Sequence, residues 1–208
     1  MTIMTKRTIK PLTSEQLFNR LGWQYVREVE KKDCKFVKTD NLRNQLANMV
    51  RLITNNQRWG LYIRGFVGNG KTTAVNALKN TINILIDEHY FKQSEIFDWD
   101  WMRVVNAREM VNMYIRNNDE MQFKAVKESR WLVVDDIGTD PAEIMLYGTK
   151  FYPFVELMDY RYERRLPTVI VSNLKESELK AKYNDERFSD RFNEMFNATT
   201  FRDNSFRV

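Results

Sequence analysis

The chain has 208 residues, of which 43% are hydrophobic, and it carries a net charge of +5 at pH 7. This length suffices for one well-packed domain with a modest extension and is too short for two full-sized domains. No stretch approaches the roughly 18 apolar residues that cross a bilayer, and the N-terminal residues lack the apolar core of a signal peptide. With Cys34 as its single cysteine, the chain cannot form an internal disulfide or a cysteine-based zinc site. We therefore expect a cytoplasmic protein without a membrane partner.

The positive charge is concentrated in the first part of the chain. Residues 1–58 contain 12 Lys and Arg against 5 Asp and Glu, whereas residues 59–208 contain 21 against 23. Such a basic segment can bind nucleic acid phosphates or an acidic partner, and it can equally be a solvated helix surface. Within it, Thr13 is followed three residues later by Gln16, which predicts a capped short helix that ends at Gly22. We expect residues 1–39 to form a basic arm with this short helix.

From residue 40 onward, helical patterns alternate with short apolar strands. A helix is predicted from about Asp40, and further helices are predicted from about residues 73, 107 and 151. Strands are predicted at residues 60–64, 101–105, 131–136 and 167–173, with a last strand shortly before residue 204. Helices that alternate with continuously apolar strands indicate a parallel sheet covered on both faces. The fold class is therefore α/β, with a five-stranded parallel sheet in a core that spans residues 40–208.

The most specific signal is the segment from Gly65 to Thr72, which matches the phosphate-binding pattern G-x-x-x-x-G-K-S/T. It follows a predicted strand and precedes a predicted helix, which is the context this Walker A motif requires. Its glycines allow backbone N–H groups to surround a polyphosphate, and the helix adds its positive N-terminal end. The Lys71 amine is expected to bind the β- and γ-phosphates, and the Thr72 hydroxyl to ligate Mg²⁺. The expected nucleotide-binding residues are Gly65, Val67, Gly68, Asn69, Gly70, Lys71, Thr72 and Thr73.

A second motif lies at the end of the predicted strand 131–136, where an apolar run finishes in Asp135 and Asp136. This is the Walker B pattern. Asp135 is expected to hold Mg²⁺, directly or through water, and Asp136 to orient the attacking water. The alternative is a strand that simply turns at Asp and Gly. Asn173 follows another strand, and because ligands bind at the carboxyl ends of parallel strands, it is expected near the same site.

These motifs, together with the strand Arg164–Leu174 and the segment Glu186–Phe192, resemble the DnaC/DnaI-type helicase loaders and the IstB transposition helpers. Both groups are AAA+ ATPases with a P-loop NTPase core, and the resemblance covers about residues 40–208. It implies ATP and Mg²⁺ as cofactors and Asn173 as sensor 1, which helps to position the hydrolytic water. It also implies an arginine finger that reaches a neighbouring subunit's ATP, with Arg191 as the first candidate and Arg187 as the second. The alternative for each arginine is a surface ion pair with Glu186, Asp190 or Glu194.

Two features depart from the family pattern. Asp136 stands where most AAA+ enzymes have glutamate, so we expect hydrolysis to be slow without a stimulating partner. The chain ends just after the last predicted strand, so we expect the helical lid to be absent.

The resemblance predicts an ATPase that assists DNA replication, foremost a helicase loader that forms homo-oligomers with ATP. Its expected partners are DNA, single-stranded in preference to duplex, and a replicative helicase. One alternative is an IstB-like helper that acts with a transposase on duplex DNA. Another is an adaptor that binds ATP with negligible hydrolysis.

Overall fold

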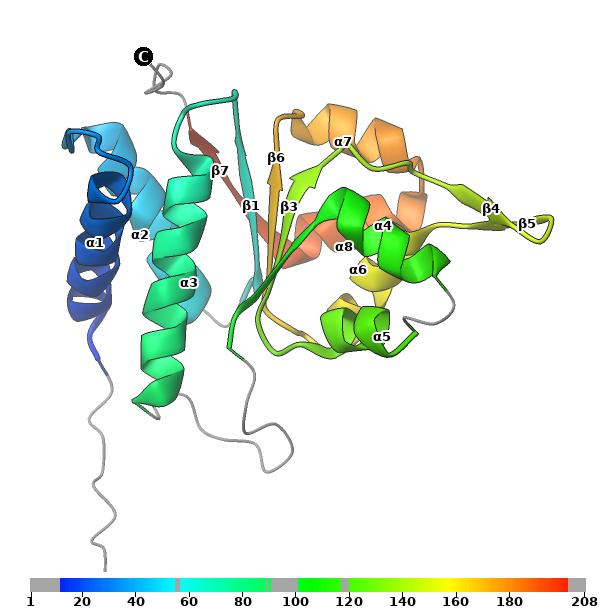
Figure 1. The fold of residues 1–208 in the computed structure, drawn as a ribbon, viewed down its shortest axis with the longest axis horizontal. Coiled ribbons are helices and arrows are strands. Elements are labelled where there is room, and N and C mark those ends of the chain that lie inside the picture. The colour runs from blue at the N-terminus through cyan, green and yellow to red at the C-terminus, as the bar shows by residue number, and fades with distance from the viewer. Residues whose placement is uncertain (1–11, 55–56, 89, 91–100, 117–119, 202–208) are drawn as a thin grey trace, which may run out of the picture.

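A computed structural model describes residues 12–54, 57–88, 90, 101–116 and 120–201 (Figure 1). Its centre is a sheet of five strands in the order β2-β3-β6-β1-β7, in which every neighbouring pair is parallel. The strands are β1 (Gly60–Gly65), β2 (Arg103–Asn106), β3 (Leu132–Ile137), β6 (Thr168–Ser172) and β7 (Phe196–Phe201). The predicted five-stranded parallel sheet is therefore confirmed.

Helices cover both faces of this sheet (Figure 1). One face carries α1 (Ser14–Glu30), α2 (Asp40–Thr54) and α3 (Lys71–Asp87). The other face carries α4 (Ala107–Ile115), α5 (Glu120–Glu128), α6 (Pro153–Glu163), α7 (Glu176–Tyr183) and α8 (Glu186–Met195). A two-stranded hairpin, β4 (Ile144–Leu146) and β5 (Thr149–Phe151), projects from this second side. The hairpin and helices α5, α7 and α8 were not predicted from the sequence.

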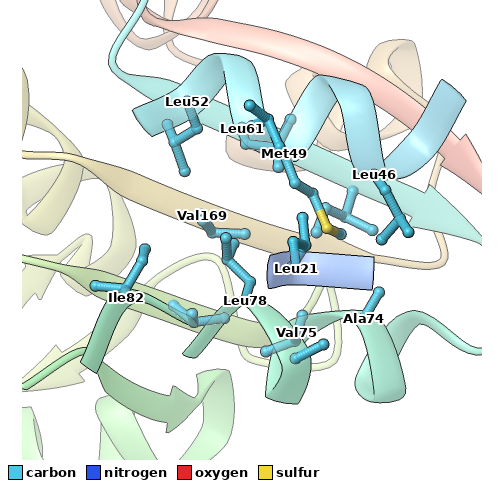
Figure 2. Close-up of a cluster of buried hydrophobic side chains, with 14 of the residues drawn as sticks. Leu21, Leu46, Met49, Leu52, Leu61, Ala74, Val75, Leu78, Ile82 and Val169 are labelled. Atoms are coloured by element: carbon cyan, nitrogen blue, oxygen red, sulfur yellow. The ribbon is translucent and has the colours of Figure 1, made fainter. Parts of the chain in front are cut away.

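Alternate residues of each central strand supply the two cores. On β1, Leu61 and Ile63 join the cluster beneath α1, α2 and α3, whereas Tyr62 joins the cluster beneath α4 to α8. Strand β6 does the same, with Val169 on the first side and Ile170 on the second. Successive side chains of a strand point to opposite faces, so a strand buried on both faces must be apolar throughout. Figure 2 shows the first cluster, in which side chains of α1, α2 and α3 meet those of β1 and β6.

Helix α1 is longer than predicted. Its N-terminus has the expected capping box, in which the Gln16 N–H donates to Thr13 Oγ1 at 3.2 Å and the Thr13 N–H donates to Gln16 Oε1 at 2.9 Å. The helix nevertheless continues through Gly22 to Glu30, so the prediction that Gly22 ends it was wrong. Glycine within a helix costs about 1 kcal/mol relative to alanine, and tertiary packing offsets that cost here.

That packing ties α1 to the rest of the domain. Leu17, Leu21 and Tyr25 are buried in the same cluster as residues of α3 and β1. Helix α1, before the predicted boundary at residue 40, thus shares one hydrophobic core with α2, α3 and β1, after it. No helix in the described part of the chain is long and apolar enough to cross a membrane. The expectation about the helical lid concerns the chain after β7, and residues 202–208 lie outside the described residues.

Candidate nucleotide-binding site

The P-loop connects the carboxyl end of β1 to the first turn of α3. Gly70 caps α3 with a left-handed backbone (φ 88°), a conformation that glycine adopts without strain. Residue 65 is glycine for a different reason, because atoms of Asn69 and Phe201 lie too close to its backbone to leave room for a side chain. A Cβ at this position would lie 2.3 Å from Asn69 Nδ2 and 2.4 Å from the carbonyl oxygen of Phe201. The loop can therefore close only without a side chain at residue 65.

Asn69 anchors the loop to the sheet. Its side chain is buried, and its Nδ2 donates to the carbonyl oxygen of Phe201 at the end of β7 at 2.6 Å. Phe66 and Val67, by contrast, expose their side chains at the outer side of the loop. The loop is thus fixed on the side that faces the sheet and accessible on the other.

Lys71 is buried at the centre of the site. Its Nζ donates to the carbonyl oxygens of Gly65 at 2.6 Å and Phe66 at 2.8 Å, and to Asn173 Oδ1 at 2.8 Å. Burial lowers the pKa of this amine below its usual value. The structure therefore brings Lys71 and Asn173, which the sequence places on two different elements, into direct contact.

The two carboxylates of the second motif lie at the end of β3. Burial and the neighbouring charge of Asp136 raise the pKa of Asp135 above its usual value, while its hydrogen bond from the Asp136 N–H and the Lys71 charge oppose the shift. Asp136 is exposed and has a left-handed backbone (φ 56°), with its Oδ2 at 3.4 Å from Asn106 Nδ2. A bulky residue seldom adopts this conformation, and aspartate is among those that tolerate it. The turn thereby separates the two carboxylates, one half-buried and one facing solvent.

The donor set suits Mg²⁺ in company with a nucleotide. The described residues contain no group of three or more His, Cys, Asp or Glu side chains that could hold a metal by themselves. Mg²⁺ is commonly bound by one or two protein oxygens and by substrate phosphates, with water completing its shell. Asp135 and the exposed Thr72 hydroxyl supply oxygens of that kind. They fit the predicted metal, which would neutralise phosphate charge when bound.

A cavity of about 640 Å³ adjoins the P-loop. One wall is formed by residues 68–73, and the other by the end of α1, the start of α2 and the linker between them. The two walls are joined where Lys32 Nζ donates to Thr73 Oγ1 at 2.8 Å. The linker side is lined by Tyr25, Val29, Lys32, Asp33, Cys34, Lys35, Phe36, Val37, Thr39 and Leu42. Sequence reasoning missed this wall, although the apolar pair Phe36 and Val37 within a lysine-rich linker was a signal for it.

Three solved structures resemble the fold of this chain. DnaI superimposes with a TM-score of 0.61 at 18% identity, covering 83% of this chain and 88% of that one. The DnaC helicase loader gives 0.56 at 18% identity, over 80% and 93%. The chain shares the P-loop fold of these proteins. The replication initiator DnaA, bound to AMPPCP and single-stranded DNA, gives 0.54 at 16% identity, over 83% of this chain and 50% of that one.

The similarity lies in structure rather than in sequence. No protein-family model matches this chain, and no curated protein matches it. The P-loop fold predicted from the motifs is confirmed, as is the structural similarity to DnaI and the DnaC helicase loader, and the resemblance to IstB helpers stays a prediction.

The two candidate finger arginines lie outside the cavity beside the P-loop. Arg187 and Arg191 are both on α8, where they line a second pocket of about 720 Å³. This pocket shares no lining residue with the cavity beside the P-loop. The structure thus brings Lys71, Asn173 and the β3 carboxylates together, and it leaves both arginines outside that group.

The pKa shifts at the site predict how ATP binding depends on pH. Because the pKa of Asp135 is raised, its carboxyl takes up a proton at a higher pH than an ordinary aspartate, and the Mg²⁺-dependent part of ATP affinity should fall as the solution is acidified. Because the pKa of Lys71 is lowered, affinity should also fall on the alkaline side, with or without Mg²⁺. ATP titrations at a series of acid, neutral and alkaline pH values, each with and without Mg²⁺, measure both effects.

Asp135→Asn supplies the control. This variant should bind Mg²⁺-ATP weakly at every pH and should lose most of the acid-side dependence. If it kept the acid-side fall of the unsubstituted chain, Asp135 would not be the titrating group.

Proposed function

We propose that the protein is an ATPase that assists DNA replication as a helicase loader, assembling with ATP and binding DNA and a replicative helicase. The observation that carries this proposal is the meeting of Lys71, Asn173, Asp135 and Asp136 at one edge of the sheet. They meet in a fold shared with DnaI and the DnaC helicase loader.

In this proposal the phosphates of ATP lie against the N–H groups of the P-loop and the N-terminus of α3. The Lys71 amine exchanges its hydrogen bonds with the Gly65 and Phe66 carbonyl oxygens for bonds with the β- and γ-phosphates. Asn173, which already accepts from Lys71, then lies next to the γ-phosphate and can sense it. Asp136 faces solvent and orients the attacking water. A bound Mg²⁺ on Thr72 and Asp135 would neutralise part of the phosphate charge.

The cavity beside the P-loop accommodates the nucleoside in this proposal. Its volume of about 640 Å³ is within the range of small-ligand sites, and its wall combines apolar with basic side chains. Tyr25 and Phe36 meet edge to face there, with ring centres 6.3 Å apart. A base can pack on such apolar surface while Lys32 and Lys35 stay near the polar part of the ligand.

The partners follow from charge and from the structural neighbours. Lys31, Lys32, Lys35 and Lys38 are exposed in and beside the linker between α1 and α2, where they can contact phosphates of DNA. The DnaA neighbour is bound to single-stranded DNA, and the DnaC neighbour is a helicase loader. We therefore propose single-stranded DNA and a replicative helicase as partners, and ATP-dependent homo-oligomers as the active form.

ATP turnover with and without DNA tests the proposal. We expect slow turnover alone and stimulation by single-stranded DNA. Lys71→Ala should abolish both, whereas Lys79→Ala, on the same helix but outside the P-loop, should leave both unchanged.

The other outcomes separate the alternatives. Stimulation by duplex DNA in preference to single strands would favour a transposition helper. Tight ATP binding without turnover in any condition would contradict the ATPase and favour an adaptor.

A further inference from the structure

The cavity beside the P-loop has a basic lining. Among the described residues that form its walls, three are lysines, Lys32, Lys35 and Lys71, and one is an acid, Asp33. Lys71 belongs to the P-loop, whereas Lys32 and Lys35 belong to the linker between α1 and α2. Side chains of one charge that line a cleft concentrate ligands of the opposite charge, so this lining favours an anionic ligand.

Lys32 lies beside the N-terminal end of α3. Its Nζ donates to Thr73 Oγ1 at 2.8 Å. The Ala74 N–H donates to the Gly70 carbonyl oxygen at 3.0 Å and so makes the first hydrogen bond of the helix. The N–H groups of the three residues before Ala74 lie ahead of that bond, and N–H groups in this position bind phosphate at helix N-termini. Thr73 is the last of these three residues, so Lys32 reaches the phosphate-binding end of α3.

The backbone that carries Lys32 is fixed at the end of α1. The Asp33 N–H donates to the Glu30 carbonyl oxygen at 3.0 Å. The Cys34 N–H donates to the Val29 carbonyl oxygen at 3.4 Å. With the left-handed backbone of Asp33 (φ 53°), these bonds form a Schellman motif, which ends a helix in a defined geometry. The linker therefore leaves α1 in a set direction, and Lys32 lies within the turn.

A second contact ties this end of α1 to α3. The buried Glu28 accepts from Asn80 Nδ2 of α3 at 3.0 Å through its Oε1 atom. Lys32 thus approaches Thr73 from a helix end that is itself attached to α3. Lys35 offers a contrast, since it lines the same cavity but makes no hydrogen bond or ion pair within the described part of the chain. Of the two linker lysines, only Lys32 is held against the P-loop side of the cavity.

The direction of approach indicates which phosphate Lys32 meets. In the P-loop pattern, backbone N–H groups surround the α- and β-phosphates, and the lysine of the motif reaches the β- and γ-phosphates. Lys32 comes from the linker wall, where the proposed site accommodates the nucleoside. The phosphate next to the nucleoside is the α-phosphate. An ammonium group has three N–H donors, and the bond to Thr73 uses one of them, which leaves donors for a phosphate oxygen.

We propose that Lys32 is a second phosphate-binding lysine, which donates from the linker to the α-phosphate while Lys71 binds the β- and γ-phosphates. This inference rests on the proposed binding of ATP at the P-loop. It assigns a ligand contact to a segment outside both Walker motifs. Because ATP and ADP both carry the α-phosphate, Lys32 contributes equally to the binding of either nucleotide.

Isothermal titration calorimetry with Mg²⁺ and either AMPPCP or ADP tests the inference without turnover. Lys32→Ala should weaken both nucleotides by the same factor of about ten, the lower end for a hydrogen bond to a charged group, because Lys32 is exposed. Lys71→Ala should weaken AMPPCP more than ADP, because ADP has no γ-phosphate to lose. Lys35→Ala is the matched control from the same linker and should weaken each nucleotide by less than about fivefold.

Two further variants separate phosphate binding from a purely structural link between the linker and α3. Lys32→Arg keeps the positive charge, whereas Lys32→Gln keeps an N–H donor for Thr73 but carries no charge. We expect Lys32→Arg to bind both nucleotides more tightly than Lys32→Gln does. If Lys32→Gln bound them as tightly as the unsubstituted chain, the charge would not act on a phosphate and the proposal would be overturned.

The failure of this inference can be told apart from that of the proposed function. Equal losses in Lys32→Ala and Lys35→Ala, or a loss in Lys32→Ala for AMPPCP but not for ADP, would overturn the role of Lys32 and leave the ATPase standing. Tenfold losses for both nucleotides, in a protein that shows no turnover in any condition, would support Lys32 and contradict the ATPase. If the unsubstituted chain bound neither nucleotide, both proposals would be overturned.

Discussion

Arg161→Leu is expected to lower the free energy of unfolding by about 3–5 kcal/mol, the range of a broken buried hydrogen-bond network. Arg161 lies on α6 and is fully buried. Its guanidinium donates to Thr168 Oγ1 and to the carbonyl oxygens of Ser129 and Pro167, each at 2.7 Å, and to that of Lys127 at 3.1 Å. It thereby ties α6 to the segments before β3 and β6. Leucine fills much of the volume but removes the Arg161 donor from these oxygens, and the bonds to Thr168 Oγ1 and to the Ser129 carbonyl oxygen are fully buried.

Urea denaturation of matched variants measures this effect. Arg164→Leu is the control, because Arg164 lies next to α6 with half of its side chain exposed; its contacts are a 3.8 Å ion pair with Glu163 and a cation–π contact 3.7 Å from the centre of the Tyr160 ring. We expect this control to change stability by no more than about 1 kcal/mol. The stability of Arg161→Lys should lie between those of the two leucine variants, since a single ammonium group cannot reproduce the planar set of donors of a guanidinium. Equal midpoints for Arg161→Leu and Arg164→Leu would contradict the structural role.

Arg161 also shows where reasoning from sequence reaches its limit. The apolar residues of α6 predicted the helix correctly, yet arginine is almost never fully buried, so nothing marked residue 161 as part of the core. Arg191 is a similar case. Sequence proximity pointed to Glu186, Asp190 or Glu194 as ion-pair partners, whereas the structure pairs it with Asp159 on another helix. Partners across a helix interface depend on rotation and crossing angle, which a single sequence does not encode locally.

The sheet and the P-loop were predictable for the opposite reason. Continuous apolar strands can be satisfied only by burial on both faces, and the motif from Gly65 to Thr72 carries its geometry within eight residues. The linker wall of the adjacent cavity could not be predicted from local sequence in this way. It exists because α1 extends past Gly22 and brings the linker beside the P-loop, which is a consequence of tertiary packing.

Lys71→Ala should weaken ATP binding by about 30- to 150-fold, which corresponds to the 2–3 kcal/mol of a lost charge-assisted hydrogen bond. The cavity offers a way to measure binding without any turnover. Cys34 is the only cysteine of the chain, is exposed and lines the same cavity as the P-loop residues. Bound ATP should therefore shield Cys34 from an alkylating reagent. The alkylation rate as a function of ATP concentration then gives the dissociation constant for each variant.

Lys35→Ala is the matched control, because Lys35 lines the same cavity but lies outside the P-loop and is exposed. An exposed lysine contributes mainly screened attraction, so we expect its loss to weaken binding by less than about fivefold, or 1 kcal/mol. Equal protection of Cys34 in Lys71→Ala and the unsubstituted chain would show that Lys71 does not bind phosphate. ATP binding without any protection of Cys34 would instead keep Lys71 at the phosphates and place the nucleoside outside this cavity. The two variants thus separate the phosphate end of the site, which the sequence predicted, from the nucleoside end, which only the structure indicates.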